Sequence, residues 1–449
     1  MKIIQLSEKI AYGLGDMASS FIFAVVTSFL MYYYTDVFGL SAAVVGTLLF
    51  AARMIDAITD PLMGIIADRT KTRWGRFRPY ILFGSLPMAI LAILTFTTPD
   101  LSANSKIIYA YATYTALMIC YTIVNIPYSS LPTLMSSNSE ERTELASWRM
   151  FFAFLSGLIV SGITLPLVNY FGAGNEQKGF QMVMTMFACL SLVLFLVTFF
   201  FTKERVKPLK SNSSLKEDFS VVIRNKAWWI LLIVGMLIFS VITLPFAVGM
   251  YFFRYNVGNV DLATGFFVSG NVGMIAGALL TGTVLNKRFC KVKTLMVTQF
   301  VFALLVVNFY WIDITNLALV YGLMGLVMAA MGAGVPLLWS MTADTADYSE
   351  WKSHKRVIGL TTSSVTFSHK FGMGLSGMIT GLILTYFGYA AGESQTPDAL
   401  YGIILMMSIL PAVGGVLNGL ILSQFPINKA ICQDMNIELE RRRKALESI

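Results

Sequence analysis

The stretch AARMIDAITDPLMGIIADRTKTRWGRFRPYIL, residues 51–82, decides how this chain folds. It begins with an apolar run long enough to cross a bilayer, since a spanning helix needs roughly 20 mostly apolar residues. That run contains Arg53, Asp56 and Asp60, and it ends in a loop that carries five basic residues. Acids inside a membrane helix, followed by a basic loop, predict a membrane protein with functional charges within the bilayer.

The composition of the whole chain agrees with this stretch. Of 449 residues, 56% are hydrophobic and only 13% are charged, whereas soluble chains carry about 25% charged residues. So few charges cannot cover several globules in water, and the composition therefore predicts a polytopic membrane protein. The four cysteines have no metal-ligand spacing, which argues against a zinc site or a disulfide scaffold.

Apolar windows separated by charge clusters and turns predict an all-α protein with twelve spanning helices. The first window lacks a cleavage site and is interpreted as a spanning helix, not a signal peptide. We expect a six-helix bundle over 1–202, a central cytoplasmic loop over 203–227, a second bundle over 228–425 and a cytoplasmic tail over 426–449. The spans are expected at about 10–37, 42–67, 80–98, 106–134, 147–171, 179–201, 228–255, 261–285, 293–312, 315–342, 357–388 and 398–424.

The distribution of basic residues predicts the orientation. With both termini in the cytoplasm, 27 of the 33 Lys and Arg residues lie on the cytoplasmic side, three on the other side and three within spans. This asymmetry is a strong positive-inside signal. It predicts a multi-pass protein with both termini in the cytoplasm, and it explains the net charge of +8 without a nucleic-acid partner.

The two halves of the sequence echo one another. The loop ADRTKTRWGRFRPY at 67–80 has its counterpart in NKRFCKVK at 286–293, two helices into each half. Six plus six spans with a parallel repeat and a central loop are typical of the major facilitator fold. In that fold, the substrate site lies near the bilayer midplane between the halves.

Asp56 and Asp60 lie four residues apart on one helical face, and Arg53 lies nearly on the same face. Two such carboxylates can bind a small cation jointly or share a proton. Thr59 and, on the fourth span, Thr122 add hydroxyl oxygens, which would suit Na⁺. The alternative is that Arg53 and Asp56 form a neutral pair that staples helices together.

The fourth span has a polar and aromatic face in YTIVNIPYSSL, with Tyr121, Thr122, Asn125, Tyr128 and Ser129. Such a face suits a sugar, whose hydroxyls need polar partners and whose ring packs on aromatic planes. Hydrogen bonding between helices is the alternative use of these residues.

Several polar residues near helix ends have more than one interpretation. Asp16 and Ser20 lie one turn apart on the first span, where Asp16 could pair with a loop base. Arg149, at the start of the fifth span, could guard the inner mouth, bind a substrate oxygen, or extend to the interface. Arg254, at the far end of the seventh span, is interpreted mainly as an interfacial anchor.

In the second half, Lys370 lies too deep in the eleventh span to reach the interface. We expect it to face the central cavity and to pair with an acid of the second span or with the substrate, with a structural bridge as the alternative. His369 beside it is expected to be a hydrogen-bonded core residue. Trp339 precedes the stretch ADTADYSEW, and Thr366 lies one turn before Lys370.

Several stretches of the chain resemble the glycoside-pentoside-hexuronide:cation symporters, a family that includes the melibiose carrier. They are YGLGD, MYYYTDVFGL, residues 52–82, YTIVNIPYSSL, and DTADYSEW followed by Lys370. The resemblance implies uptake of a sugar or glycoside with Na⁺ or H⁺ by alternating access, without a further cofactor. It implies a cation site at Asp56, Thr59, Asp60 and Thr122.

The resemblance also implies roles for residues around the cavity. Positions near the sugar or the cavity are implied for Arg149, Trp339, Thr366 and Lys370, and a bacterial inner-membrane location is implied as well. We expect further substrate contacts from Ser20, Asn125, Tyr128 and Ser129, and coupling or gating roles for Asp16, Arg53, Asp344 and Asp347. The chain departs from melibiose-carrying members, which have acids at Ser20 and Asn125 and a tryptophan at Ser129. These departures argue against simple galactosides and make an anionic glycoside, such as a uronide, plausible.

Other functions remain open at this point. A cation-coupled transporter of lysolipids or other organic anions would need an apolar path that opens to lipid. A membrane enzyme could use Asp56 and Asp60 as an acid/base pair, but no nucleophile motif, metal cluster or phosphate loop accompanies them. A receptor-like protein would not need buried acids. The expected partners are the substrate, the coupling cation and the bilayer, and a monomer is expected to suffice.

Overall fold

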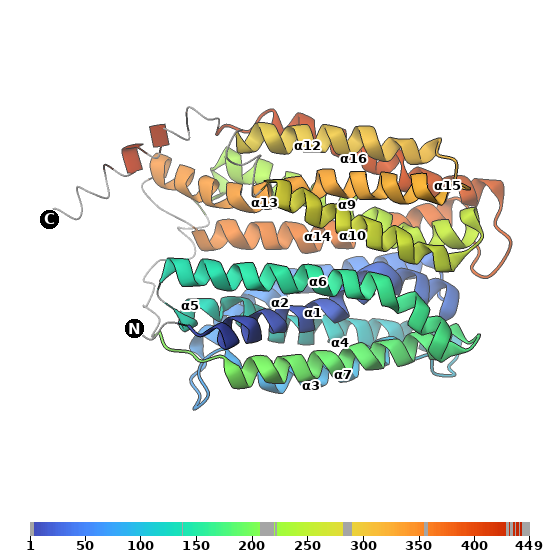
Figure 1. The fold of residues 1–449 in the computed structure, drawn as a ribbon, viewed down its shortest axis with the longest axis horizontal. Coiled ribbons are helices and arrows are strands. Elements are labelled where there is room, and N and C mark those ends of the chain that lie inside the picture. The colour runs from blue at the N-terminus through green and yellow to red at the C-terminus, as the bar shows by residue number, and fades with distance from the viewer. Residues whose placement is uncertain are drawn as a thin grey trace. The chain divides into compact units, whose positions relative to one another are not determined.

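The protein is described by a computed structural model, in which the described residues are almost entirely helical (Figure 1). The described residues are 4–136, 138–206, 220, 222–281, 290–353, 358–427, 431, 434, 435, 437–439 and 441. Much of the predicted central loop and most of the predicted C-terminal tail lie outside them.

The first half of the chain forms six long helical segments. Its elements are α1 (Leu6–Tyr32), the π-helical turn η1 (Tyr33–Val37), α2 (Ala42–Arg69), α3 (Arg78–Thr95), α4 (Ala103–Ser130), α5 (Pro132–Met135), α6 (Ser139–Gly172) and α7 (Glu176–Phe201).

The second half forms six further segments. Its elements are α9 (Lys226–Tyr251), the π-helical turn η2 (Phe252–Val257), η3 (Val260–Leu262), α10 (Ala263–Leu280), α12 (Lys291–Val306), η5 (Val307–Tyr310), α13 (Leu317–Ser353), α14 (Ile358–Tyr386), α15 (Pro397–Met407) and α16 (Ile409–Leu422).

Each of the twelve predicted spans therefore corresponds to a helical segment. Eleven helices among the described residues are long and apolar enough to cross a membrane. The remaining segment, α14, is long enough but falls outside this set, and its sequence contains the polar run TTSSVTFSHK. The last span is interrupted at Ser408, between α15 and α16, because Pro411 has no N–H for the Met407 carbonyl.

The chain divides into two compact units that do not coincide with its sequence halves. The first unit contains residues 1–209, 246–268 and 377–402, and the second contains 210–245, 269–376 and 403–449. Helices α9, α10 and α14 therefore each contribute one end to the first unit. In that unit α1 packs against α6 and α7, and α4 packs against α2 and α3.

The second unit is built around α12, which packs against α13 and α16. Polar side chains join its helices internally. The Trp228 indole N–H donates to the Ser364 hydroxyl at 2.6 Å, and the Asn418 amide donates to Gln299 Oε1 at 3.3 Å. Such contacts satisfy polar groups that have no water partner in a bilayer.

Candidate cation and substrate site

The acids of α2 and a hydroxyl of α4 come together in the first unit. The Thr122 Oγ1 atom lies 2.8 Å from Asp60 Oδ1 and 3.4 Å from Asp56 Oδ1. Ile58 and Leu62 on α2 are exposed, as apolar residues facing lipid would be. The amphipathic pattern of α2 thus turns Asp56 and Asp60 inward, toward α4, where both face the Thr122 hydroxyl.

Arg53 occupies the other oxygen of Asp56. Its Nη1 atom lies 3.2 Å from Asp56 Oδ2 and 3.3 Å from the Met118 sulfur, and its guanidinium lies 5.3 Å from the centre of the Phe23 ring. Both members of the ion pair are buried, Arg53 at 4% and Asp56 at 1% exposure. Arg53, Asp56 and Asp60, taken together in their ionised forms, carry a net charge of −1.

Two further oxygen atoms lie on the same turn of α2. The Thr59 hydroxyl is buried and has no hydrogen-bond partner among the described residues. Pro61 lies inside the helix and has no N–H to give to the Ala57 carbonyl. Within the described part of the chain, no group of three or more His, Cys, Asp or Glu side chains comes together. Carboxylate and hydroxyl oxygens are ligands suited to a hard cation such as Na⁺ rather than to zinc.

A second polar cluster joins α1, α4 and α6. Asp16 accepts a hydrogen bond from Arg149 Nε at 2.7 Å, and the Arg149 guanidinium lies 5.5 Å from the centre of the Tyr128 ring. The Tyr128 hydroxyl donates to the Tyr12 carbonyl at 2.6 Å, and the two rings stack at 4.9 Å. Asp16 thus pairs with a base on another long helix, and Arg149 points at an acid and an aromatic plane.

The YGLGD motif explains how these helices come so close. A methyl group on Gly13 would lie 2.5 Å from the Phe152 ring of α6, and one on Gly15 would lie 2.5 Å from the Tyr128 ring of α4. Only glycine leaves room for this packing. The two glycines therefore bring Asp16, the next residue, within reach of Arg149.

The other predicted residues of the first unit lie nearby on α1 and α4 and are half-buried. Ser20 lies one turn after Asp16 on α1, and Asn125 lies between Tyr121 and Ser129 on α4. The Ser129 hydroxyl donates to the Ile126 carbonyl at 2.9 Å. The Tyr121 ring stacks on Phe23 with the ring centres 5.5 Å apart.

The other predicted substrate residues, Trp339, Thr366 and Lys370, belong to the second unit. On α14, Lys370 is half-buried, and the Thr366 hydroxyl donates to the Thr362 carbonyl at 3.3 Å. The His369 ring lies 4.2 Å from that of Phe239. On α13, Trp339 is exposed at 38%. The pairing of Lys370 with an acid of α2 stays a prediction.

The two predicted gating acids on α13 lie one turn apart. Lys291 Nζ, at the start of α12, lies 2.9 Å from both carboxylate oxygens of Asp344. Asp347 is half-buried. The Lys291–Asp344 pair therefore joins α12 to α13 within the second unit.

Sequence reasoning missed a third polar cluster, at the end of α1. The Tyr389 hydroxyl donates to Asp36 at 2.6 Å, and Tyr255 also contacts this carboxylate. Arg254, expected to be an interfacial anchor, pairs with Glu176 at 2.7 Å. The signal that could have revealed this cluster is the similarity between residues 31–39, MYYYTDVFG, and residues 250–258, MYFFRYNVG.

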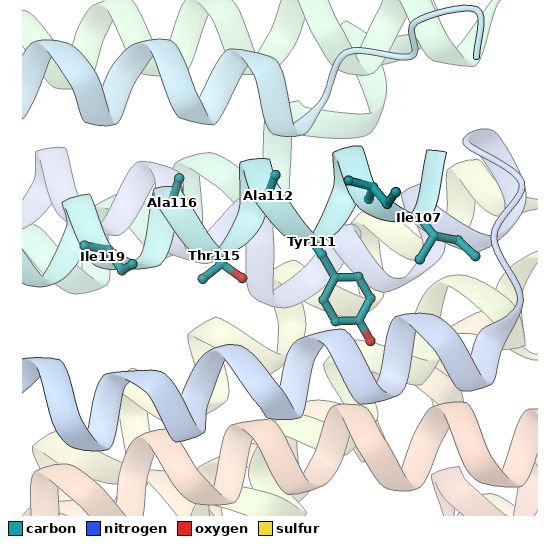
Figure 2. A pocket seen from close by; sticks show the side chains of 7 residues that line it. Ile107, Tyr111, Ala112, Thr115, Ala116 and Ile119 are labelled. Atoms are coloured by element: carbon teal, nitrogen blue, oxygen red, sulfur yellow. The ribbon is translucent and has the colours of Figure 1, made fainter. Parts of the chain in front are cut away.

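A groove of about 710 Å³ runs along α4 away from these clusters. Figure 2 shows its side chains along one face of the helix, and the Tyr111 hydroxyl lies 3.0 Å from that of Thr47 on α2. Its lining residues are Ile107, Ile108, Tyr111, Ala112, Thr115, Ala116 and Ile119. This surface is apolar and lacks the acids expected of a coupling site.

Comparison with solved structures identifies the fold. The structure matches that of a D-xylose-proton symporter with a TM-score of 0.66 over 93% of this chain and 97% of that chain, at 15% sequence identity. A likeness at this identity shows a shared fold alone. The predicted fold class is therefore confirmed.

The family follows from the sequence. The MFS/sugar transport protein family matches residues 11–429, and the chain belongs to this family. The chain is 36% identical to the putative glycoside/cation symporter YagG of Escherichia coli, over 99% of this chain and 97% of that relative. It is also 36% identical to the isoprimeverose transporter of Lactiplantibacillus pentosus, over 98% and 92%. Identity to the glucuronide carrier protein homolog of Escherichia coli is 31%, over 98% and 96%.

These relatives confirm the resemblance to glycoside-pentoside-hexuronide:cation symporters. Because the family consists of transporters, the chain is a transporter and not an enzyme.

Proposed function

We propose that this chain imports a sugar or glycoside by symport with a monovalent cation, through alternating access of its two six-helix halves. The observation that carries the proposal is the geometry of Asp56, Asp60 and Thr122, in which two carboxylate oxygens face one hydroxyl. Arg53 offsets one of the two negative charges. Carboxylate and hydroxyl oxygens brought this close together are the ligands that a small monovalent cation needs.

We propose Na⁺ as this cation, bound by Asp56, Asp60, Thr59 and Thr122. A proton would need only the carboxylates, whereas Na⁺ also needs neutral oxygen ligands. The buried Thr59 hydroxyl, which has no partner among the described residues, supports the Na⁺ site. Arg53 then has a coupling role, because it shares Asp56 with the cation.

The cluster around Asp16 and Arg149 supports sugar binding close to the cation site. Sugars need hydrogen-bonding groups at fixed positions together with aromatic planes. Asp16, Arg149, Tyr128 and Asn125 provide these groups on α1, α4 and α6. Ser20 and Ser129 lie within a turn of them and complete the proposed contacts in the first unit.

Whether the site favours a neutral or an anionic substrate depends on which acid balances the positive charge of Arg149. Asp16 already pairs with Arg149 at 2.7 Å, so this pair offers no net positive charge to a carboxylate. We therefore propose that a neutral glycoside binds in preference to a uronide. Recognition of a uronide would depend on Lys370, with Trp339 and Thr366 as the other contacts from the second unit.

We also propose a bacterial inner-membrane location with both termini in the cytoplasm. The asymmetric distribution of Lys and Arg supports this orientation. Asp344 and Asp347 would then lie toward the cytoplasmic side, where the Lys291–Asp344 pair is placed to act in gating.

Ligand binding to the purified protein tests the proposed function. Isothermal titration with matched neutral and uronic glycosides, each with and without Na⁺ at fixed pH, measures substrate class and ion together. Because coupling is reciprocal, Na⁺ should raise the affinity for a neutral glycoside roughly fivefold or more. An affinity that responds to pH but not to Na⁺ would reject the Na⁺ site. A preference for the uronide would reject the proposed substrate charge.

A transport measurement complements the titration. Asp56→Asn in proteoliposomes should abolish accumulation of the sugar against its gradient, while exchange of sugar across the membrane persists. Accumulation at the wild-type level would remove Asp56 from the cation site.

A further inference from the structure

The ends of α1 and α9 form an internal repeat in both sequence and backbone. Residues 31–39 read MYYYTDVFG and residues 250–258 read MYFFRYNVG. Each helix ends in a π-helical turn, and each turn is followed by a glycine with positive φ, 85° at Gly39 and 82° at Gly258. Single π-turns inside or at the end of helices are rare and frequently mark functional sites. Here the same device occurs at the end of the first long helix of each half.

The two repeats contact one another within the first unit. The Tyr32 and Tyr251 rings meet edge to face with their centres 6.0 Å apart, and the Thr35 hydroxyl lies 2.7 Å from the Tyr251 hydroxyl. Both tyrosines and Thr35 are fully buried. The contact therefore excludes solvent where the first helices of the two halves end.

Asp36 is the central acceptor of this contact. Its carboxylate accepts hydrogen bonds from the Tyr389 hydroxyl at 2.6 Å and the Thr35 hydroxyl at 2.7 Å, and from the Tyr255 hydroxyl. Burial raises the pKa of Tyr389, and the nearby Tyr251 and Asp36 raise it further. Tyr389 therefore stays protonated and remains a donor. Three hydroxyls, two of them from the second half of the sequence, thus hold one carboxylate of the first half.

The only base in the two repeats is already balanced by another acid. Arg254 lies 2.7 Å from Glu176, and it also contacts the Tyr32 hydroxyl, which donates to Glu176 at 2.9 Å. Among the described residues, the Asp36 carboxylate is held by hydrogen bonds from hydroxyls and has no ion pair. Water can replace each hydroxyl as a donor to this carboxylate, so the contact can open without leaving the acid unsolvated.

We propose that Asp36, Tyr255 and Tyr389, together with the Arg254–Glu176 pair, form a gate that closes this end of the transport path and opens once in each cycle. The inference rests on the proposed transport function, because in the facilitator fold the path runs between the two halves. The gate joins residues of the first half to the end of α9 and to the loop that follows α14. Opening requires that Asp36 exchange its tyrosine partners for water.

Hydrogen exchange measured by mass spectrometry on the intact purified protein tests the gate. Asp36→Asn weakens all three hydrogen bonds to the carboxylate, and Tyr389→Phe removes one of them with a minimal change in shape. Tyr33→Phe is the matched control, because the Tyr33 hydroxyl bonds Thr98 at 2.8 Å within the first half. The readout is the exchange rate of residues 250–258, which lie far from all three substitutions in sequence.

We expect exchange in residues 250–258 to accelerate roughly tenfold in Asp36→Asn and by a smaller factor in Tyr389→Phe. Tyr33→Phe should leave it unchanged. If Tyr389→Phe and Tyr33→Phe lower the melting temperature equally and neither changes exchange in this segment, the contact is a permanent staple and the proposal is wrong. No sugar is added, so the result does not depend on whether a glycoside binds.

Discussion

Two clusters of the first unit each hold an acid within the protein, Asp56 buried and Asp36 half-buried, and the two acids have different kinds of partner. In the α2–α4 cluster, Asp56 forms an ion pair with Arg53. One oxygen of Asp56 and one oxygen of Asp60 also face the Thr122 hydroxyl. In the α1–α9 cluster, Asp36 is surrounded by protein hydroxyls. The first arrangement offers oxygen ligands to a cation. In the second, the Asp36 carboxylate accepts its hydrogen bonds from hydroxyls of the protein. We therefore expect the first cluster to bind a ligand and the second to serve a structural or gating role.

Substituting an acid should give the largest difference in Na⁺ affinity between the two clusters. Asp60→Asn removes one negative charge from the cation site, and we expect Na⁺ to bind roughly 100-fold more weakly, since contacts to charged groups contribute about 1.5–3 kcal/mol. Asp36→Asn should leave Na⁺ affinity within about twofold of wild type, because on our account Asp36 holds no ion. Titration of Na⁺ against protein fluorescence measures both. A similar loss of Na⁺ affinity in both variants would show that the two clusters do not differ in cation binding.

Substituting a base should give an intermediate difference between the two clusters in the effect of Na⁺ on sugar affinity. Arg53→Gln removes the base that holds Asp56 Oδ2, so the Asp56 carboxylate loses its fixed orientation in the proposed cation site. We expect the Na⁺ effect on sugar affinity to fall about tenfold. Arg254→Gln should instead change exchange in residues 250–258 and leave the Na⁺ effect intact. An unchanged Na⁺ effect in Arg53→Gln would mean that Arg53 only holds the helices together.

Substituting a hydroxyl residue should give the smallest change in Na⁺ affinity. Thr122→Val removes one proposed Na⁺ ligand without changing size, and we expect roughly five- to tenfold weaker Na⁺ binding. Thr115→Val, on the apolar groove of the same helix, is the matched control and should have no effect. An effect of Thr115→Val as large as that of Thr122→Val would show that α4 is sensitive to any valine.

Helix positions and helix faces could be predicted from the sequence, because both follow from local rules. Apolar length placed the twelve segments, and a spacing of four placed Asp56 and Asp60 together. The partners across helices could not be predicted in this way. Asp16 and Arg149 are 133 positions apart, and their contact depends on how closely Gly13 and Gly15 let α1 approach its neighbours.

The gate escaped prediction for a related reason. The repeat MYYYTDVFG and MYFFRYNVG is visible in the sequence, but its meaning depends on the two copies meeting in space. Tyr389 enters the same contact from a loop more than 350 residues after Asp36. Spacing rules describe single helices and say nothing of such contacts. The break at Ser408 likewise reflects Pro411 in the following turn, a local signal that apolar length conceals.

The most direct test of the central claim is the affinity of the purified protein for a neutral glycoside, measured with and without Na⁺ at fixed pH, in wild type and in Asp60→Asn. We predict that Na⁺ raises this affinity at least about fivefold in wild type, within the usual 1–3 kcal/mol range of coupling energies. In Asp60→Asn the effect of Na⁺ should vanish while basal sugar binding remains. A Na⁺ effect of wild-type size in Asp60→Asn would contradict the account.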